Sequence, residues 1–182
     1  TGWVTGDGSF FGDSKLTVDD YKNEAQKKYG DKTSLFLSIF PASTIDEVKL
    51  AKQKLTMMDF AVLPSHLLAE FNTKTTFIYQ FGHVPPDKPN FPNYGAFHTS
   101  EVPFALHTLH TWNRPWQKLD RDLENIISSY WVNFAKTGDP NGGNLPVWKS
   151  YDRQSGNILL LGDVVEIKAG FLKKEIGFLE SN

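Results

Sequence analysis

Residues 95–104, Gly-Ala-Phe-His-Thr-Ser-Glu-Val-Pro-Phe, place a histidine after a long loop and before one expected helical turn over residues 101–106. The loop, residues 82–95, is rich in proline, asparagine and glycine. It follows the clearest strand of the chain, residues 75–81, which is rich in β-branched and aromatic residues. In an open sheet flanked by helices, functional side chains lie in loops beyond the C-terminal ends of strands. His98 is therefore a candidate general base, although a solvated loop histidine is the simpler interpretation.

Outside this region the sequence predicts mainly helices. Thr17 is an expected N-cap of a helix that Gly30 ends, and Thr44-Ile45-Asp46-Glu47 is a capping box that begins a helix running to about Leu55. Further helices are expected over residues 32–39, 59–71 and 119–137 and from about residue 171. The helix over residues 119–137 has the clearest apolar stripe, at spacings of three and four: Leu123, Ile126, Ile127, Tyr130, Trp131 and Phe134.

The expected strands are few and scattered. Trp3 and Val4 form the end of one strand, and residues 158–161 and 164–168 form a hairpin around a Gly-Asp turn. The pattern predicts the α/β class: mostly helices, with a few strands of an incomplete sheet whose other strands lie in sequence outside this chain. We find no repeat or interdomain linker, and we expect residues 1–182 to be part of a single domain.

A second candidate side chain lies near the start of the chain. Residues 2–11 read Gly-Trp-Val-Thr-Gly-Asp-Gly-Ser-Phe-Phe, so Asp7 lies between two glycines just beyond an expected strand end. Small neighbours allow a carboxylate to approach another backbone or an imidazole closely. Asp7 could then accept a hydrogen bond from His98 and fix its tautomer. The alternative is an ordinary Gly-Asp-Gly turn.

Other polar constellations are weaker. His107 and His110 are three residues apart, but no third metal ligand has a suitable spacing. His98 and Glu101 form a His-x-x-Glu pair that lacks the repeat expected of a carboxylate-bridged metal site. The tryptophans could bind an aromatic ligand, but core packing explains them as well. The sequence contains no Gly-rich phosphate loop, and we expect no metal and no cofactor.

The composition narrows the class of protein. The hydrophobic content is 40%, the charged content 22% and the net charge −2, values typical of a globular protein. This charge gives no reason to expect nucleic acid or an anionic membrane surface as a partner. The absence of cysteine excludes disulfides and thiol nucleophiles within the chain. It does not fix the compartment, and the first residue is not a methionine.

Taken together, these segments resemble the C-terminal part of the type-B carboxylesterase family, which includes cholinesterases, within the α/β-hydrolase fold. The acid motif of that family resembles G-x-x-x-D-E-G-x-x-F, and Asp7 falls at its acid position. The histidine motif resembles G-x-x-H-x-x-E-x-x-F, and its fixed positions are matched here: Gly95, His98, Glu101 and Phe104. A third landmark is the run Tyr-Trp-Val-Asn-Phe-Ala-Lys-Thr-Gly-Asp-Pro-Asn over residues 130–141.

The resemblance implies a serine esterase acting on a small-molecule ester. His98 would be the base, Asp7 the acid that orients it, and Glu101 a residue that hydrogen-bonds near the histidine loop. The family's nucleophile lies in G-x-S-x-G upstream of the acid, and no such motif occurs here. We therefore expect this chain alone to be inactive, to need the upstream N-terminal part of the same protein, and to self-associate when isolated.

Two other interpretations remain open from sequence. One is a non-catalytic, cholinesterase-like interaction domain, although such proteins usually lose triad residues. The other is an independent small α+β binding domain whose motif matches are accidental. The lack of cysteine favours a bacterial source, and the resemblance favours a secreted or periplasmic location. The sequence identifies neither the acyl group nor the alcohol of the substrate.

Overall fold

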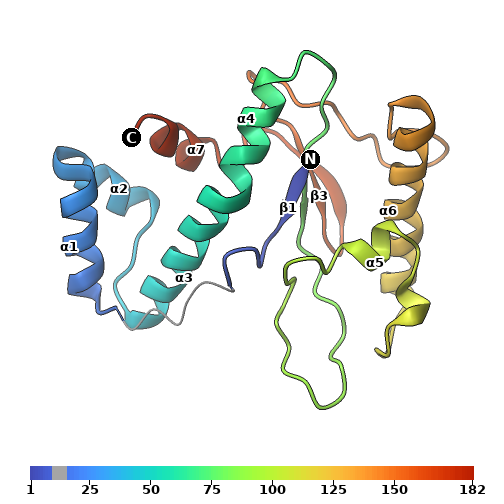
Figure 1. Cartoon of the computed structure of the whole chain (residues 1–182), viewed down its shortest axis with the longest axis horizontal. Coiled ribbons are helices and arrows are strands. Elements are labelled where there is room, and N and C mark those ends of the chain that lie inside the picture. The colour runs from blue at the N-terminus through green and yellow to red at the C-terminus, as the bar shows by residue number, and fades with distance from the viewer. Residues whose placement is uncertain (10–15) are drawn as a thin grey trace. The chain divides into compact units, whose positions relative to one another are not determined.

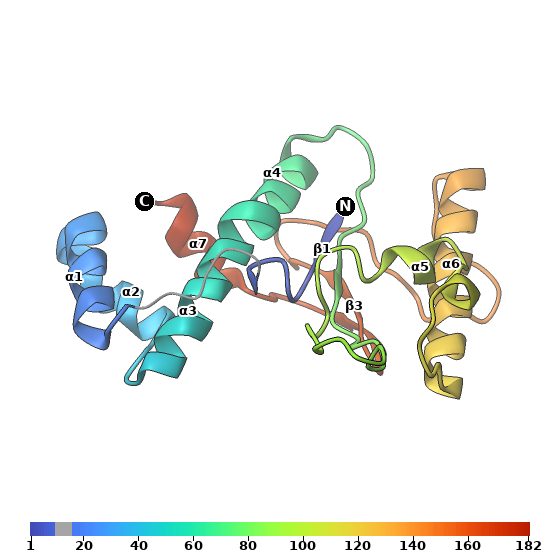
Figure 2. The ribbon, with the colours of Figure 1, turned by 60° about the horizontal axis from the view of Figure 1, so that its bottom comes forward.

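The computed structural model describes residues 1–9 and 16–182, which divide into two compact units. The first unit contains Thr1–Gly6 and Ser65–Phe171, and the second contains Asp7–Pro64 and Leu172–Asn182. Figures 1 and 2 label the helices and strands of both units. The α/β class expected from the sequence is confirmed: helices predominate and the strands form one small mixed sheet.

The sheet lies in the first unit and has the order β1-β2-β3-β4. Strands β1 (Gly2–Val4), β2 (Tyr79–Phe81) and β3 (Ile158–Leu161) are mutually parallel, and β4 (Val165–Lys168) pairs antiparallel with β3. The predicted hairpin is therefore confirmed, with Leu161 opposite Val165. Three of the four β3 side chains are buried, as expected of a strand that has a partner on both sides.

Helix α6 (Lys118–Thr137) supplies one wall of the core in this unit. Leu123, Ile127 and Tyr130 recur at helical spacing and are buried, which confirms the helix and most of its predicted stripe. Phe134 at the end of that stripe is half exposed. Gly138 ends the helix with φ 79°, a left-handed conformation that glycine adopts without steric cost. The short helix α5 (Val102–Ala105) lies against α6 (Figures 1 and 2).

The strand predicted over residues 75–81 is wrong in extent, because only Tyr79–Phe81 pairs as a strand. The first residue of β1, Gly2, pairs with Tyr79, so residues 75–78 have no residue of β1 beside them to pair with. Their carbonyl groups accept other donors: Thr76 accepts from the N–H of Tyr151, and Ile78 accepts from the indole of Trp148. High strand propensity indicates an extended backbone, but a strand also needs a partner.

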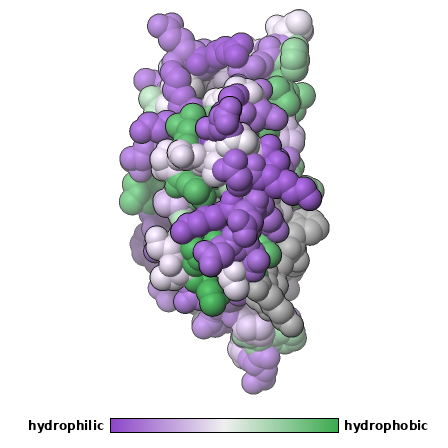
Figure 3. Space-filling view, turned by 90° about the vertical axis from the view of Figure 1, so that its left-hand side faces the viewer, coloured by the Kyte–Doolittle hydropathy of each residue, from purple (hydrophilic) through white to green (hydrophobic). Residues whose placement is uncertain are grey.

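The second unit is helical and comprises α1 (Val18–Tyr29), α2 (Thr33–Ile39), α3 (Ile45–Met57) and α7 (Lys173–Glu180). Both predicted N-terminal caps are confirmed: Thr17 and Thr44 each accept a backbone N–H three residues later in a complete capping box. The core of this unit is aromatic, with Phe36 stacked on Tyr29 at 4.5 Å and next to Phe178 at 5.9 Å. The side of the molecule where Figure 1 places α1 is mostly hydrophilic (Figure 3).

The helix predicted over residues 59–71 is confirmed as α-helix from Leu63 to Phe71, but its first residues have another helical form. Residues Met58–Val62 make a π-helical turn that continues α3, and α4 covers Leu63–Phe71. Pro64 lacks an N–H and its ring collides with the carbonyl four residues earlier, so a widened turn at this point relieves the conflict. Four apolar residues that recur here at helical spacing are exposed, with Phe71 at 81%: Phe60, Leu67, Leu68 and Phe71.

Gly6 is the glycine of the first unit at which a side chain would cause the most severe clash. A Cβ atom there would lie 2.2 Å from the carbonyl oxygen of Ala96. We predict that Gly6→Ala lowers the free energy of unfolding by at least about 2 kcal/mol in urea titrations. Gly162→Ala is the control, because its Cβ would meet Val164 at an ordinary 3.7 Å and should change stability by less than about 1 kcal/mol. Equal stabilities of the two variants would contradict this packing.

His66 on α4 is buried and predicts a pH dependence of stability. Its Nδ1 lies 3.2 Å from the hydroxyl of Tyr151, and burial lowers the pKa of His66 from 6.5 to about 4. The unfolded chain therefore binds an additional proton between pH 6.5 and 4, so the folded state loses stability as the pH falls through that window. The loss attributable to His66 is about 3 kcal/mol.

We predict that His66→Gln flattens the decline of unfolding free energy between pH 6.5 and 4. His110→Gln removes an exposed histidine and should leave the decline unchanged. Urea titrations at several pH values measure both slopes. If wild type and His66→Gln decline in parallel, the buried neutral imidazole is not the cause.

Candidate active site

The backbone after β1 runs beside the backbone that leads to His98. The N–H of Gly6 donates to the carbonyl of Ala96 at 2.8 Å, and Gly6 and Phe97 form an isolated parallel bridge. The next residue along one segment is Asp7, and the next residue along the other is His98. Two segments far apart in sequence are thus paired immediately before the two predicted triad residues.

Gly8 provides a second close approach, within the helical unit. A Cβ atom on Gly8 would lie 1.9 Å from the carbonyl oxygen of Gln53 on α3. Asp7 between the two glycines is buried, with 4% of its surface exposed. The Gly-Asp-Gly run is therefore more than a solvated turn, because each glycine allows a contact that any side chain would block. The motif residues Phe10 and Phe11 lie outside the described part of the chain.

His98 occupies a tight turn with an exposed side chain. The N–H of Ser100 donates to the carbonyl of Phe97 at 2.9 Å, and Ser100 itself is completely buried. Thr99 adopts φ 72°, an unusual backbone conformation for a β-branched residue and one that concentrates at functional sites. We call residues 97–100 the His98 turn. Its imidazole is accessible, while Ser100 anchors the turn in the interior. This arrangement is suited to proton transfer with a bound molecule.

The predicted helical turn after His98 is confirmed as α5. The carbonyl of Glu101 accepts the N–H of Ala105 at 3.0 Å, and Glu101 is partly buried at the N-terminal end of this helix. Pro103 and Phe104 are buried and fix α5 in the core. Glu101 therefore lies at the junction between the His98 turn and its helical anchor, not on an open surface.

The loop before His98 is held by Arg114. The guanidinium donates to the carbonyl of Pro86 at 2.5 Å and lies 5.7 Å from the ring of Phe97 and 5.8 Å from that of Trp112. The Phe97 and Trp112 rings are stacked with an angle of 10° between their planes. Packing of this kind accounts for Trp112 without a ligand and supports the residue next to His98.

His83 is a site residue that the sequence analysis missed. This buried side chain lies two residues after the end of β2 and places both ring nitrogens against carboxylates. Its Nε2 is 2.6 Å from Asp120 on α6, and its Nδ1 is 2.7 Å from Asp163 in the β3–β4 turn. The three residues are far apart in sequence and follow no motif spacing. The available signals were a histidine at a strand end and an aspartate at a helix start.

Glu124 is a second buried carboxylate on α6. It accepts the N–H of Leu109 at 2.9 Å and lies 3.8 Å from the imidazole of His107. The hydrogen bond to Asn125 and, secondarily, the charge of Glu124 raise the pKa of His107. His107 is thus paired with α6, which disfavours the metal-ligand interpretation of His107 and His110. Throughout residues 1–9 and 16–182, no group of three or more metal-binding side chains is assembled.

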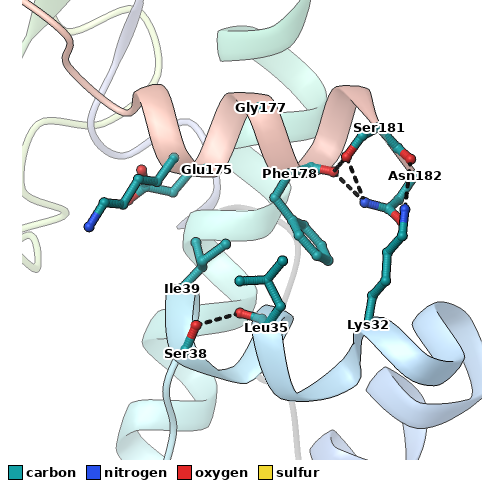
Figure 4. Close-up of a pocket in the computed structure, with 10 residues that line it drawn as sticks. Lys32, Leu35, Ser38, Ile39, Glu175, Gly177, Phe178, Ser181 and Asn182 are labelled. Carbon is teal, nitrogen blue, oxygen red and sulfur yellow. Dashed lines mark hydrogen bonds between the residues drawn. The ribbon is translucent and has the colours of Figure 1, made fainter.

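Two cavities are lined by residues other than those of the His98 turn. One of about 600 Å³ in the helical unit is lined by α2 and α7, with Phe178 pointing toward Leu35 and Ile39 (Figure 4). At its end, Lys32 donates to the carbonyl of Ser181 at 3.2 Å. A second cavity of about 400 Å³ in the first unit is lined by aromatic side chains that include Phe77, Tyr79 and Trp131. In the described part of the chain, no helix is long and apolar enough to cross a membrane.

Known proteins similar to this chain are esterases and lipases. The chain is 34% identical to the bile salt-activated lipase of Rattus norvegicus over 95 residues, 50% of this chain and 15% of that protein. It is 25% identical to the bile salt-activated lipase of Homo sapiens over 168 residues, 81% of this chain and 22% of that protein. It is 34% identical to the phenmedipham hydrolase of Pseudarthrobacter oxydans over 91 residues, 47% of this chain and 18% of that protein.

The chain thus spans less than a quarter of the length of these relatives. The model of the Carboxylesterase family matches residues 13–179, which is most of the chain. That match extends well beyond the region of the His98 turn and includes α6 and the hairpin. The similarity to a family of ester hydrolases and the α/β class agree with the resemblance seen in the sequence. This chain belongs to the carboxylesterase family.

Proposed function

We propose that this chain is the C-terminal portion of a serine carboxylesterase and supplies the histidine and the acid of its Ser-His-acid triad. The observation that carries the proposal is the backbone pairing of Gly6 with Ala96 and Phe97, one residue before Asp7 and His98. Membership in the carboxylesterase family supports the reaction class. The order of acid before histidine agrees with that of α/β-hydrolases.

In this mechanism the ester carbonyl is attacked by a serine that this chain does not contain. His98 removes the serine proton as the carbon–oxygen bond forms, and it then protonates the departing alkoxide. Water deacylates the enzyme by the same two proton transfers in reverse. A catalytic base must reach the substrate and keep a fixed position. The exposed side chain of His98 meets the first need, and the burial of Ser100 in the same turn meets the second.

Asp7 accepts a hydrogen bond from His98 in this scheme and stabilises the imidazolium that forms. Its burial fits that role, because a carboxylate shielded from water interacts more strongly with a neighbouring cation. Glu101 supports the turn from its position at the start of α5. These assignments require neither a metal nor a cofactor.

The nucleophile and the oxyanion-hole donors belong to upstream sequence in this proposal. The chain contains no G-x-S-x-G, and Ser100, although close to His98 in sequence, is completely buried and so unsuited to attack a substrate. The chain alone is therefore expected to be inactive toward esters. The helices before Phe71 and the loop over residues 82–94 would help to wall the substrate pocket.

We predict that His98→Ala in the full-length protein lowers kcat for p-nitrophenyl butyrate by about a thousandfold or more, because the serine loses its base. His110→Ala, which removes an exposed histidine, is the control and should retain wild-type activity. Initial rates and circular dichroism of both variants make the comparison. A folded His98→Ala variant with full activity would refute the base assignment, whereas an inactive wild type would favour a non-catalytic interaction domain.

We predict that Asp7→Asn lowers kcat by about a hundredfold to ten-thousandfold, since the amide favours the wrong tautomer of the histidine. Asp19→Asn makes the same chemical change at an exposed position in the first turn of α1 and should have little effect. Steady-state rates at saturating ester measure the difference. Similar rates for the two variants would remove Asp7 from the triad.

A further inference from the structure

We infer that Asp120 and Glu124 on α6 are positioning residues for His98. They are buried carboxylates one helical turn apart, and each holds one flank of the segment that carries the His98 turn. Asp120 holds His83 before the turn, and Glu124 holds Leu109 after it. The inference rests on the proposed role of His98 as the catalytic base.

The upstream flank is held by a buried contact between an imidazole and a carboxylate. His83 and Asp120 expose only 6% and 3% of their side chains, while Asp163 on the other side of the ring exposes 72%. An ionised carboxylate can only accept hydrogen bonds, and both ring nitrogens face a carboxylate oxygen within 2.7 Å. Each ring nitrogen of His83 is therefore set against an acceptor, and the two contacts together fix the orientation of the ring. Asp120 also accepts the N–H of Gln117 at 2.6 Å, which fixes it at the start of α6.

The downstream flank is held by a charge-assisted hydrogen bond. The carboxylate of Glu124 accepts the N–H of Leu109 in a buried setting, and Leu109 is completely buried. Without this acceptor, the amide of Leu109 would lack a partner in the core, at a cost of about 1–3 kcal/mol. His107, 3.8 Å away, faces the same carboxylate from the exposed side. The chain leaving α5 is thereby fixed to the second turn of α6.

The upstream flank packs against α5, the helix that directly follows the His98 turn. The ring of His83 lies 5.5 Å from that of Phe104 on α5, at an angle of 79°, and Phe81 at the end of β2 lies 5.3 Å from Phe104. Asp120 is therefore connected through His83 and Phe104 to the helix that anchors the turn. The residue before the turn, Ala96, is held by its pairing with Gly6.

Folding stability alone does not explain why Asp120 and Glu124 are carboxylates and not apolar residues. Replacement of a buried ion pair by apolar residues of similar volume is often neutral or stabilising, whereas a directional pair fixes one geometry. A catalytic base needs that geometry, since a displacement of about 1 Å costs about a hundredfold in rate. The position of His98, more than the folding free energy, is what this pair of carboxylates determines.

The test uses the full-length enzyme and two butyrate esters. p-Nitrophenolate leaves without a proton, whereas ethoxide needs protonation by His98. A displaced His98 should therefore impair ethyl butyrate more than p-nitrophenyl butyrate. A loss of folded enzyme would lower both rates equally, and titration with a covalent serine reagent corrects for it.

We predict that Asp120→Asn and Glu124→Ala each lower kcat on ethyl butyrate by about tenfold to a hundredfold, with a several-fold smaller loss on the p-nitrophenyl ester. Glu124→Gln keeps an acceptor for Leu109 and should recover most of the activity. Asp122→Asn is the matched control: it is on the same helix, but it forms an exposed pair with Lys118 and should behave as wild type.

An unchanged ratio of the two rates in both Asp120→Asn and Glu124→Ala would overturn the inference. If Asp120→Asn fails to fold, the comparison of Glu124→Ala with Glu124→Gln decides it, because equal ratios for these two contradict a positioning role. His98→Ala in the same assays separates the two proposals. If His98→Ala loses activity while the ratio of the two ester rates is unchanged in Asp120→Asn and Glu124→Ala, the proposed function stands and only the positioning role is removed.

Discussion

The short approach between Gly6 and Ala96 is the constraint on which the candidate site depends. It brings the chain after β1 within 2.8 Å of the chain before His98 and leaves no room for a side chain at Gly6. The pairing continues the parallel order of β1 and β2 past the ends of both strands, where the backbone amide of Thr5 donates to Phe81. The residues proposed for the triad therefore follow segments at the C-terminal edge of the sheet, where functional groups commonly lie in such folds.

The sheet supports this edge through a core that α6 completes. The most buried side chains of β2 and β3, with Trp148, pack against Ile127 and Tyr130. Trp148 ties this core to the chain before β2, because its indole donates to the carbonyl of Ile78. Helix α6 is long, capped at both ends and amphipathic, so it forms a stiff wall against which shorter elements are ordered. The irregular segment around α5 therefore lies against the longest helix of this unit.

Much of this could be predicted from local pattern. The N-cap at Thr17, the capping box at Thr44, the stripe of α6 and the hairpin turn are encoded in neighbouring residues, and each is found where it was expected. What depends on distant partners was not predictable. The strand at β2 is shorter than its propensity suggests because β1 meets it only from Tyr79 onward. The exposed stripe of α4 likewise has the helical spacing of a buried face.

The residues of the candidate site differ in the same way: some could be predicted from local pattern, and others depend on distant partners. His98, Asp7 and Glu101 were identified because they fall at fixed spacings within short motifs, and their roles as triad members stay predictions. His83, Asp120 and Glu124 follow no spacing: an imidazole after one strand finds its partner at the start of a helix nearly forty residues later. A buried contact of this kind is visible only when the fold brings its members together. Residues that touch a substrate can leave a local signature, whereas the residues that hold them in place are selected by three-dimensional contact alone.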